Sequence, residues 1–220
     1  MEFNLVQTIA IWALPVIFAI TLHEAAHGYV ARYFGDNTAY VLGRVSLNPL
    51  RHVDPVGTVL VPLLILVASS LFGAGSILFG WAKPVPVDFS GLRHPKRDML
   101  WVAAAGPFAN LVMALMWAFA WKFALVAPQT SFTLPLMLMA RAGVNINLVL
   151  MLLNLLPILP LDGGRIAVSL LPNRLAYKFS RTEPYGFPIL LLLVFTNLLG
   201  VVLFPMVNAS LHIIATIFQI

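Results

Sequence analysis

The chain has 220 residues, of which 60% are hydrophobic and only 10% are charged, and its mean hydropathy is +0.93. A soluble core could not hide so much apolar surface, so this composition excludes an ordinary soluble domain and indicates a membrane protein. The absence of cysteine excludes disulfides and thiolate metal ligands. The net charge of +5 is dispersed through short loops, which argues against a nucleic-acid-binding surface.

Five apolar segments are predicted, each long enough to cross the hydrocarbon of a bilayer, which takes about 20 residues. They are residues 5–34, 56–82, 99–126, 134–161 and 187–220. The last segment has room for one span and, after Pro205, a shorter helix. We expect the first segment to be retained rather than cleaved. The sequence therefore predicts one all-α polytopic membrane domain over residues 1–220, with about four to six membrane segments.

The basic residues predict how the segments are oriented, because Lys and Arg in short loops favour the cytoplasmic side. If segment 56–82 crossed once, the basic loops 35–55 and 81–98 would lie on opposite sides. We therefore predict that segment 56–82 re-enters the membrane instead, and that the N-terminus lies outside. The basic residues follow the first, second and fourth segments: Arg32, Arg44 and Arg51; Lys83, Arg93, Lys96 and Arg97; and Arg165, Arg174, Lys178 and Arg181.

Short membrane-associated strands are expected in two loops at the cytoplasmic interface. Loop 36–54 mixes β-branched residues with Gly, Asn and Pro, which is typical of short strands joined by turns. In Lys83-Pro-Val-Pro-Val87, the residues before the prolines are kept out of the helical region. An extended segment from Val85 to Val87 could also pair with an unwound substrate by edge addition.

The first segment contains the motif His23-Glu-Ala-Ala-His27. At spacing i, i+4 on a helix, both imidazoles project from one face and can share a zinc ion, while Glu24 can act on a water at that ion. Ionisable groups near the bilayer centre cost about 2.5–3.5 kcal/mol each on insertion scales, and such residues are usually functional. The alternative is a chance motif whose histidines form hydrogen bonds with other helices or lie at the membrane interface.

A catalytic zinc site keeps three protein ligands and one open position, so a third ligand is required. Asp162 is the strongest candidate by elimination, because the other acidic residues except Glu24 lie at the terminus or in loops. Pro157 and Pro160 should break the preceding helix, and Gly163-Gly164 permits unusual dihedrals, so the carboxylate can turn back toward the first segment. The alternative is an aspartate at a helix end or turn at the interface.

Three motifs occur in the order His23-Glu-x-x-His27, Ala105-Gly-Pro-x-x-Asn110 and Asn154-x-x-Pro-x-x-Pro-Leu-Asp-Gly163. Together they resemble the site-2 protease family of intramembrane zinc metalloproteases, over residues 20 to 186 approximately. Gly80-Trp-Ala-Lys-Pro-Val-Pro-Val87 resembles the compact prokaryotic branch of that family, without a PDZ or CBS domain.

The resemblance implies one Zn²⁺ per chain, bound by His23, His27 and Asp162, with Glu24 as general base. It also implies that Asn154 holds substrate or stabilises the oxyanion, and that loops 35–55 and 81–98 form a membrane-associated sheet. On residue chemistry alone, Asn154 could equally be an interhelical hydrogen-bonding residue. By the same reasoning, Gly106-Pro107 with Asn110 is interpreted as a close-packing patch with a polar clasp.

The expected function is the hydrolysis of peptide bonds in transmembrane protein substrates, in a prokaryotic cell membrane, with the active site toward the cytoplasm. Its partners would be those substrates and the lipid bilayer, and a regulatory membrane protein is left open. The alternatives are a metal transporter and a non-proteolytic zinc-binding scaffold. A transporter predicts polar residues along a path through the spans, whereas here the ionisable groups gather at one site.

Overall fold

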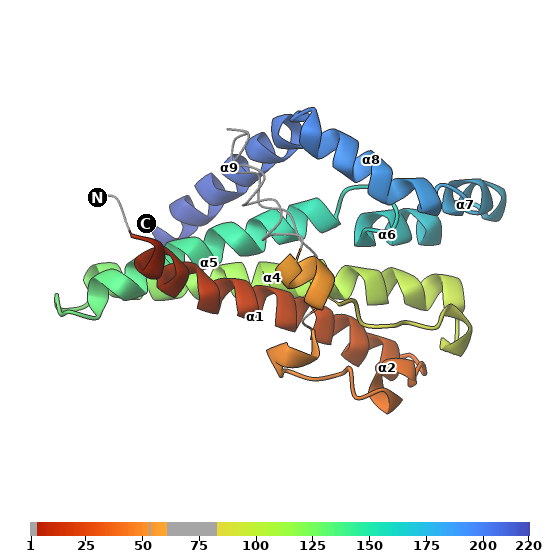
Figure 1. Cartoon of the computed structure of the whole chain (residues 1–220), viewed down its shortest axis with the longest axis horizontal. Coiled ribbons are helices and arrows are strands. Elements are labelled where there is room, and N and C mark those ends of the chain that lie inside the picture. The colour runs from red at the N-terminus through yellow and green to blue at the C-terminus, as the bar shows by residue number, and fades with distance from the viewer. Residues whose placement is uncertain (1–3, 53, 61–82) are drawn as a thin grey trace.

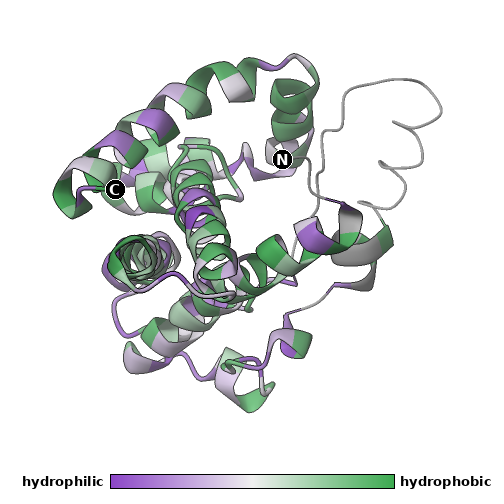
Figure 2. Ribbon diagram, turned by 90° about the vertical axis from the view of Figure 1, so that its left-hand side faces the viewer, coloured by the Kyte–Doolittle hydropathy of each residue, from purple (hydrophilic) through white to green (hydrophobic). Residues whose placement is uncertain are grey.

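The computed structural model is a helical bundle, and it describes residues 4–52, 54–60 and 83–220. Among these residues, four helices are long and apolar enough to cross a membrane. Their ribbons are mainly hydrophobic and, apart from α9, run roughly parallel along the long axis (Figures 1 and 2). The four candidate spans agree with the lower end of the predicted range, and they are α1 (Leu5–Tyr33), α4 (Pro95–Val126), α5 (Thr133–Asn154) and α9 (Leu198–Phe218).

Shorter elements occupy the loops, and no strand occurs among the described residues. The predicted short strands and the sheet are therefore wrong for the described parts of loops 35–55 and 81–98. Helical turns occupy much of the first loop, and in the second Pro84 and Pro86 have no N–H to donate to a strand ladder. The shorter elements are α2 (Thr38–Val41), 3₁₀ helices Pro49–Arg51 and Phe89–Gly91, the π-helical turn Pro55–Leu60, α6 (Asp162–Leu170), α7 (Asn173–Ser180) and α8 (Glu183–Phe195).

Small residues allow α1, α4 and α5 to pack closely. At Gly143 of α5, an added Cβ would overlap the indole of Trp117 on α4. Lipid tails are as apolar as the side chains, so close van der Waals packing stabilises helix pairs in a membrane better than burial of apolar surface does. The fully buried small side chains of α1 and α4 are Ala19, Ala25, Ala31, Ala103, Ala114, Ala118 and Ala124.

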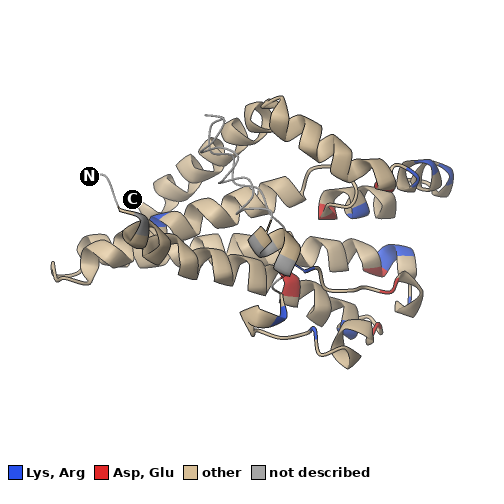
Figure 3. Cartoon of the chain, in the orientation of Figure 1, with Lys and Arg blue, Asp and Glu red and all other residues tan. Residues whose placement is uncertain are grey.

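The loops on either side of segment 56–82 lie together at one end of the bundle. The Lys83 N–H donates to the His52 carbonyl at 2.9 Å, and the Asp88 N–H donates to the Asp36 carboxylate at 2.8 Å. Most charged residues gather at this same end (Figure 3). The prediction that these two basic loops share one end is thus consistent with the fold. The predicted re-entrant path itself, residues 61–82, lies outside the described residues.

The last apolar run is divided at Asn197 and not at Pro205. Asn197 adopts a left-handed conformation, with φ of 59°, between α8 and α9. Pro205 lies inside the continuous helix α9, so the predicted shorter helix after Pro205 is wrong. A proline forfeits one backbone hydrogen bond, which membrane helices tolerate, whereas a single left-handed residue redirects the chain.

The break that precedes Asp162 occurs as predicted. Helix α5 ends at Asn154, the prolines Pro157 and Pro160 follow, and α6 begins at Asp162. Helix α8 packs directly on this connection, since a Cβ added at Gly186 would overlap the Leu159 carbonyl oxygen. The loop that carries the carboxylate is therefore bounded by α5 on one side and supported by α8.

Candidate metal centre

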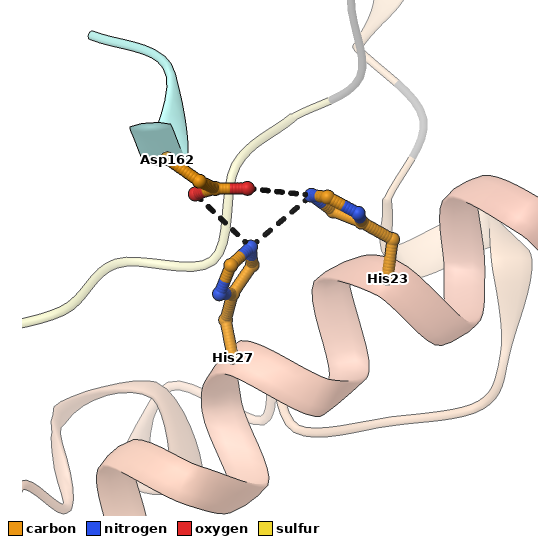
Figure 4. Close-up of side chains that lie close together, drawn as sticks. All are labelled: His23, His27 and Asp162. Carbon is orange, nitrogen blue, oxygen red and sulfur yellow. Dashed lines mark hydrogen bonds and ion pairs between the residues drawn. The ribbon is translucent and has the colours of Figure 1, made fainter. Parts of the chain in front are cut away.

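His23, His27 and Asp162 converge in the interior of the bundle. The two histidines lie one turn apart on α1, and Asp162 lies in the first turn of α6. Their side chains point toward one another (Figure 4), and the three offer ligand atoms within 4.8 Å of each other. All three residues are buried. The fold thus brings together the three metal ligands expected from the sequence. Asp162 lies at least 135 positions along the chain from either histidine.

The two imidazoles direct the same nitrogen toward Asp162. His23 Nδ1 lies 2.6 Å from Asn110 Oδ1, and His27 Nδ1 lies 2.7 Å from the Val102 carbonyl oxygen. Both partners are acceptors, so each Nδ1 carries the proton and donates it. Each Nε2 therefore keeps its lone pair toward the centre, which is the form that binds a metal ion.

The spacing of the inward atoms fits a tetrahedral zinc ion. The two Nε2 atoms are 3.1 Å apart, and they lie 3.3 and 3.4 Å from Oδ2 and Oδ1 of Asp162. Zinc with bonds of about 2.0–2.1 Å separates its tetrahedral ligands by about 3.3 Å. Two lone pairs and a carboxylate at this distance repel each other unless a cation lies between them. The donor set therefore fits zinc.

Two further features support this fit. Asp162 Oδ2 is buried and has no hydrogen-bond partner in the described part of the chain, although buried polar atoms normally have one. A Cβ added at Gly106 of α4 would overlap the Nε2 atoms of both His23 and His27. The glycine thus leaves open the space beside the ligand atoms that an ion would need.

Asp162 is in the ionised form that a metal ligand requires. Burial raises the pKa of the carboxyl, whereas hydrogen bonds from the facing imidazoles of His23 and His27, when a proton and not a metal ion lies between the groups, lower it to about 2. Its place in the first turn of α6 also favours a negative charge, because the helix dipole is positive at that end.

Glu24 lies beside the ligands and is anchored by a backbone group. Its Oε2 accepts a hydrogen bond from the Val85 N–H at 2.8 Å. The side chain is half-buried, and Oε1 has no protein partner among the described residues. One carboxylate oxygen is thus held in place while the other remains available to a proton.

Asn154 stands apart from this group in its hydrogen bonding. At the end of α5, its Nδ2 donates to the Leu150 carbonyl one turn earlier at 2.9 Å. This bond is local and orients the amide along its own helix. The role expected for Asn154 in holding substrate stays a prediction.

The sequence interpretation missed Asn110 as part of the centre. Gly106-Pro107 with Asn110 was interpreted as a packing patch, but Asn110 contacts His23 directly and Gly106 leaves room for the ligands. Asn147, which bonds Asn110, was not singled out at all. The available signal was the presence of asparagines inside largely apolar helices, where each buried polar group needs a partner.

Comparisons with known proteins agree with a metal site. Over 218 residues the chain is 39% identical to a Bacillus subtilis protein named "Putative zinc metalloprotease YwhC", covering 94% of this chain and 91% of that protein. It is 27% identical over 189 residues to the Mycolicibacterium smegmatis protein named "Putative zinc metalloprotease Rip2", covering 84% and 66% of the two chains.

A Mycobacterium tuberculosis protein with the same printed name as the last is 33% identical over 162 residues, with 72% of this chain and 54% of that protein covered. The chain thus spans nearly all of the Bacillus relative and between half and two thirds of the mycobacterial ones. No protein-family model matches the chain, and no solved structure matches it.

Proposed function

Because the chain belongs to the family of zinc metalloproteases that includes YwhC and Rip2, we propose that it is an intramembrane zinc endopeptidase of the site-2 protease type. It would hydrolyse peptide bonds of transmembrane protein substrates. We place it in a prokaryotic cell membrane, with the centre open to the cytoplasm. Lys and Arg favour that side, and most charged residues gather at the end of the bundle to which α6 belongs (Figure 3).

One observation carries the proposal: two imidazoles and a carboxylate of zinc-binding geometry lie on and against a candidate membrane span, next to Glu24. Zinc in such a site binds three protein ligands and keeps a fourth position open. His23, His27 and Asp162 would hold the ion. A glutamate adjacent in sequence to a ligand is the arrangement that metal-assisted hydrolysis of peptides uses.

When bound, zinc would supply a Lewis acid that polarises the scissile carbonyl and makes water a better nucleophile. Glu24 would take the proton of the attacking water and later deliver a proton to the leaving amine. The hydrogen bond from the Val85 N–H restrains the carboxylate, so its second oxygen is presented in one orientation. A restrained base lowers the entropic cost of reaching the reactive geometry.

The substrate has to unwind before cleavage, because the carbonyl groups of a transmembrane helix are already hydrogen-bonded within it. We propose that Asn154, at the end of α5, holds the unwound segment or stabilises the oxyanion after its side chain leaves the Leu150 carbonyl. A substrate strand that pairs with residues 85–87 would bond to the backbone carbonyl groups of these residues and to the Val87 N–H. The Val85 N–H is already bonded to Glu24.

The test is Glu24→Gln in cells that produce the full chain, compared with the wild type. New protein termini in the membrane fraction are mapped by quantitative mass spectrometry, and zinc per chain is measured on the purified proteins. We expect termini inside transmembrane segments only with the wild type, and one zinc in both proteins. Loss of the base should slow cleavage by about 100-fold or more.

Glu183→Gln is the matched control. Glu183 forms a surface pair with Arg165 at 3.6 Å, and exposed pairs contribute little, so this variant should yield the wild-type set of termini. Identical termini for the wild type and Glu24→Gln, with zinc bound in both, would remove hydrolysis from the proposal. Zinc flux into liposomes containing the wild-type protein would then favour a transporter.

A further inference from the structure

A pair of buried amides connects the candidate metal centre to two other helices. Asn110 of α4 and Asn147 of α5 are both completely buried. Asn110 Oδ1 faces His23 Nδ1 at 2.6 Å, and Asn110 Nδ2 lies 2.9 Å from Asn147 Oδ1. The contacts thus run from α5 through α4 to one ligand on α1.

Two backbone carbonyls determine which way each amide points. Asn110 Nδ2 also donates to the Ala19 carbonyl at 3.2 Å, and Asn147 Nδ2 donates to the Gly143 carbonyl at 2.8 Å. Turning either amide over would place its oxygen against a carbonyl oxygen, with no proton between them. Because a buried unpaired acceptor is costly, only one orientation of each amide satisfies all the groups.

The tautomer of His23 follows from this orientation. Asn110 presents an acceptor to Nδ1, so Nδ1 must carry the proton and Nε2 must be the free nitrogen. We propose that Asn110 is the positioning residue that fixes His23 as a zinc ligand, and that Asn147 is its support. This inference rests on the zinc centre of the proposed function and does not depend on peptide hydrolysis.

His23 depends on this pair more than His27 depends on any side chain. His27 Nδ1 donates to the main-chain oxygen of Val102, which no substitution removes. The acceptor for His23 belongs to a side chain three positions beyond Pro107 in the recognised motif. Replacing Asn110 should therefore loosen one ligand of the three and leave the other two in place.

The experiment measures zinc affinity by chelator competition on the purified full chain in detergent. Asn110→Leu removes the acceptor with little change in size, and we expect zinc to bind about 10- to 100-fold more weakly. In Asn147→Leu, the Asn110 amide still donates to the Ala19 carbonyl and keeps its orientation. We therefore expect a smaller loss of zinc affinity, of about threefold to tenfold. Asn208→Leu, on the exposed side of α9, is the matched control and should retain wild-type affinity.

A second measurement needs no substitution at Asn110. In zinc-loaded wild-type protein labelled with ¹⁵N in the imidazoles, His23 should show a protonated Nδ1 and a coordinated Nε2, with the signal assigned by its loss in His23→Gln. Coordination through Nδ1 would overturn the inference, and so would Asn110→Leu with the affinity of Asn208→Leu. Weakened zinc binding without any proteolysis would support the inference and count against the proposed function alone.

Discussion

The carboxylate of Glu24 accepts a hydrogen bond from the backbone N–H of Val85, 61 residues further along the chain, at 2.8 Å. The candidate base on α1 is therefore held by the loop that precedes α4. Val85 itself is buried, and the Lys83 carbonyl on the same loop accepts a hydrogen bond from Arg44 at 2.8 Å. The loop thus positions a side chain of the site and does more than connect two spans.

Val85→Pro should lower the rate of substrate cleavage without removing zinc. The substitution deletes the N–H that Glu24 uses, and a hydrogen bond to a charged group contributes about 1.5–3 kcal/mol, so we expect a rate about 10- to 100-fold lower. The rate is measured with a transmembrane reporter selected from the mapped cleavage sites. Val85→Ala is the control, because it shortens the same side chain but keeps the N–H that Glu24 uses. Equal rates for the two variants would exclude this role of Val85.

Asp162→Asn should reduce zinc from one per chain to well below one after dialysis. The substitution keeps the shape of the side chain but removes the charge that faces His23 and His27. A neutral amide is a poorer zinc ligand than a carboxylate, so we expect an affinity at least about 100-fold lower. Metal content is measured by mass spectrometry. The exposed Asp88→Asn serves as control, and full zinc occupancy in Asp162→Asn would show that the carboxylate is not a ligand.

Gly106→Ala should weaken zinc binding although the residue offers no ligand. Its added Cβ would overlap the Nε2 atoms of His23 and His27, and overpacking typically costs about 1–3 kcal/mol. If the imidazoles move to relieve the overlap, zinc affinity falls about 5- to 150-fold. Chelator competition measures the change. Gly200→Ala, which meets only Asn197 and Phe204 side chains, should bind zinc like the wild type.

Asn197→Val should lower the thermal stability of the helical fold. The left-handed backbone at this position costs a β-branched residue about 1–2 kcal/mol, while Asn197→Gly should be as stable as the wild type or more so. Circular dichroism in detergent follows the unfolding. Pro205→Ala should not destabilise α9, since Pro205 lies within a continuous helix. Equal stability of the Val and Gly variants would show that residue 197 is not in the left-handed conformation, and thus that the chain does not turn there between α8 and α9.

Sequence patterns predicted the long helices and the three converging residues because both depend on local features. A run of apolar residues is long enough to span or it is not, and His23 and His27 share a face through helical periodicity alone. The prolines before Asp162 end α5 wherever the chain is placed. The strands were wrong because the preference of β-branched residues for strands depends on the neighbours they pack against, and pairing partners are not visible in a linear pattern.

The sequence by itself determined a helical protein with segments long and apolar enough to span a membrane, and it contained the side chains of a candidate metal site, since hydropathy and spacing are properties of neighbouring residues. Only the tertiary structure decided that Asn110 orients His23, that Val85 holds Glu24 and that Gly106 faces the ligands. These contacts join residues that are 61 or more positions apart, and they depend on how helices pack and which backbone groups remain unpaired. Such contacts form only when the helices pack together, so the sequence of a single helix does not reveal them.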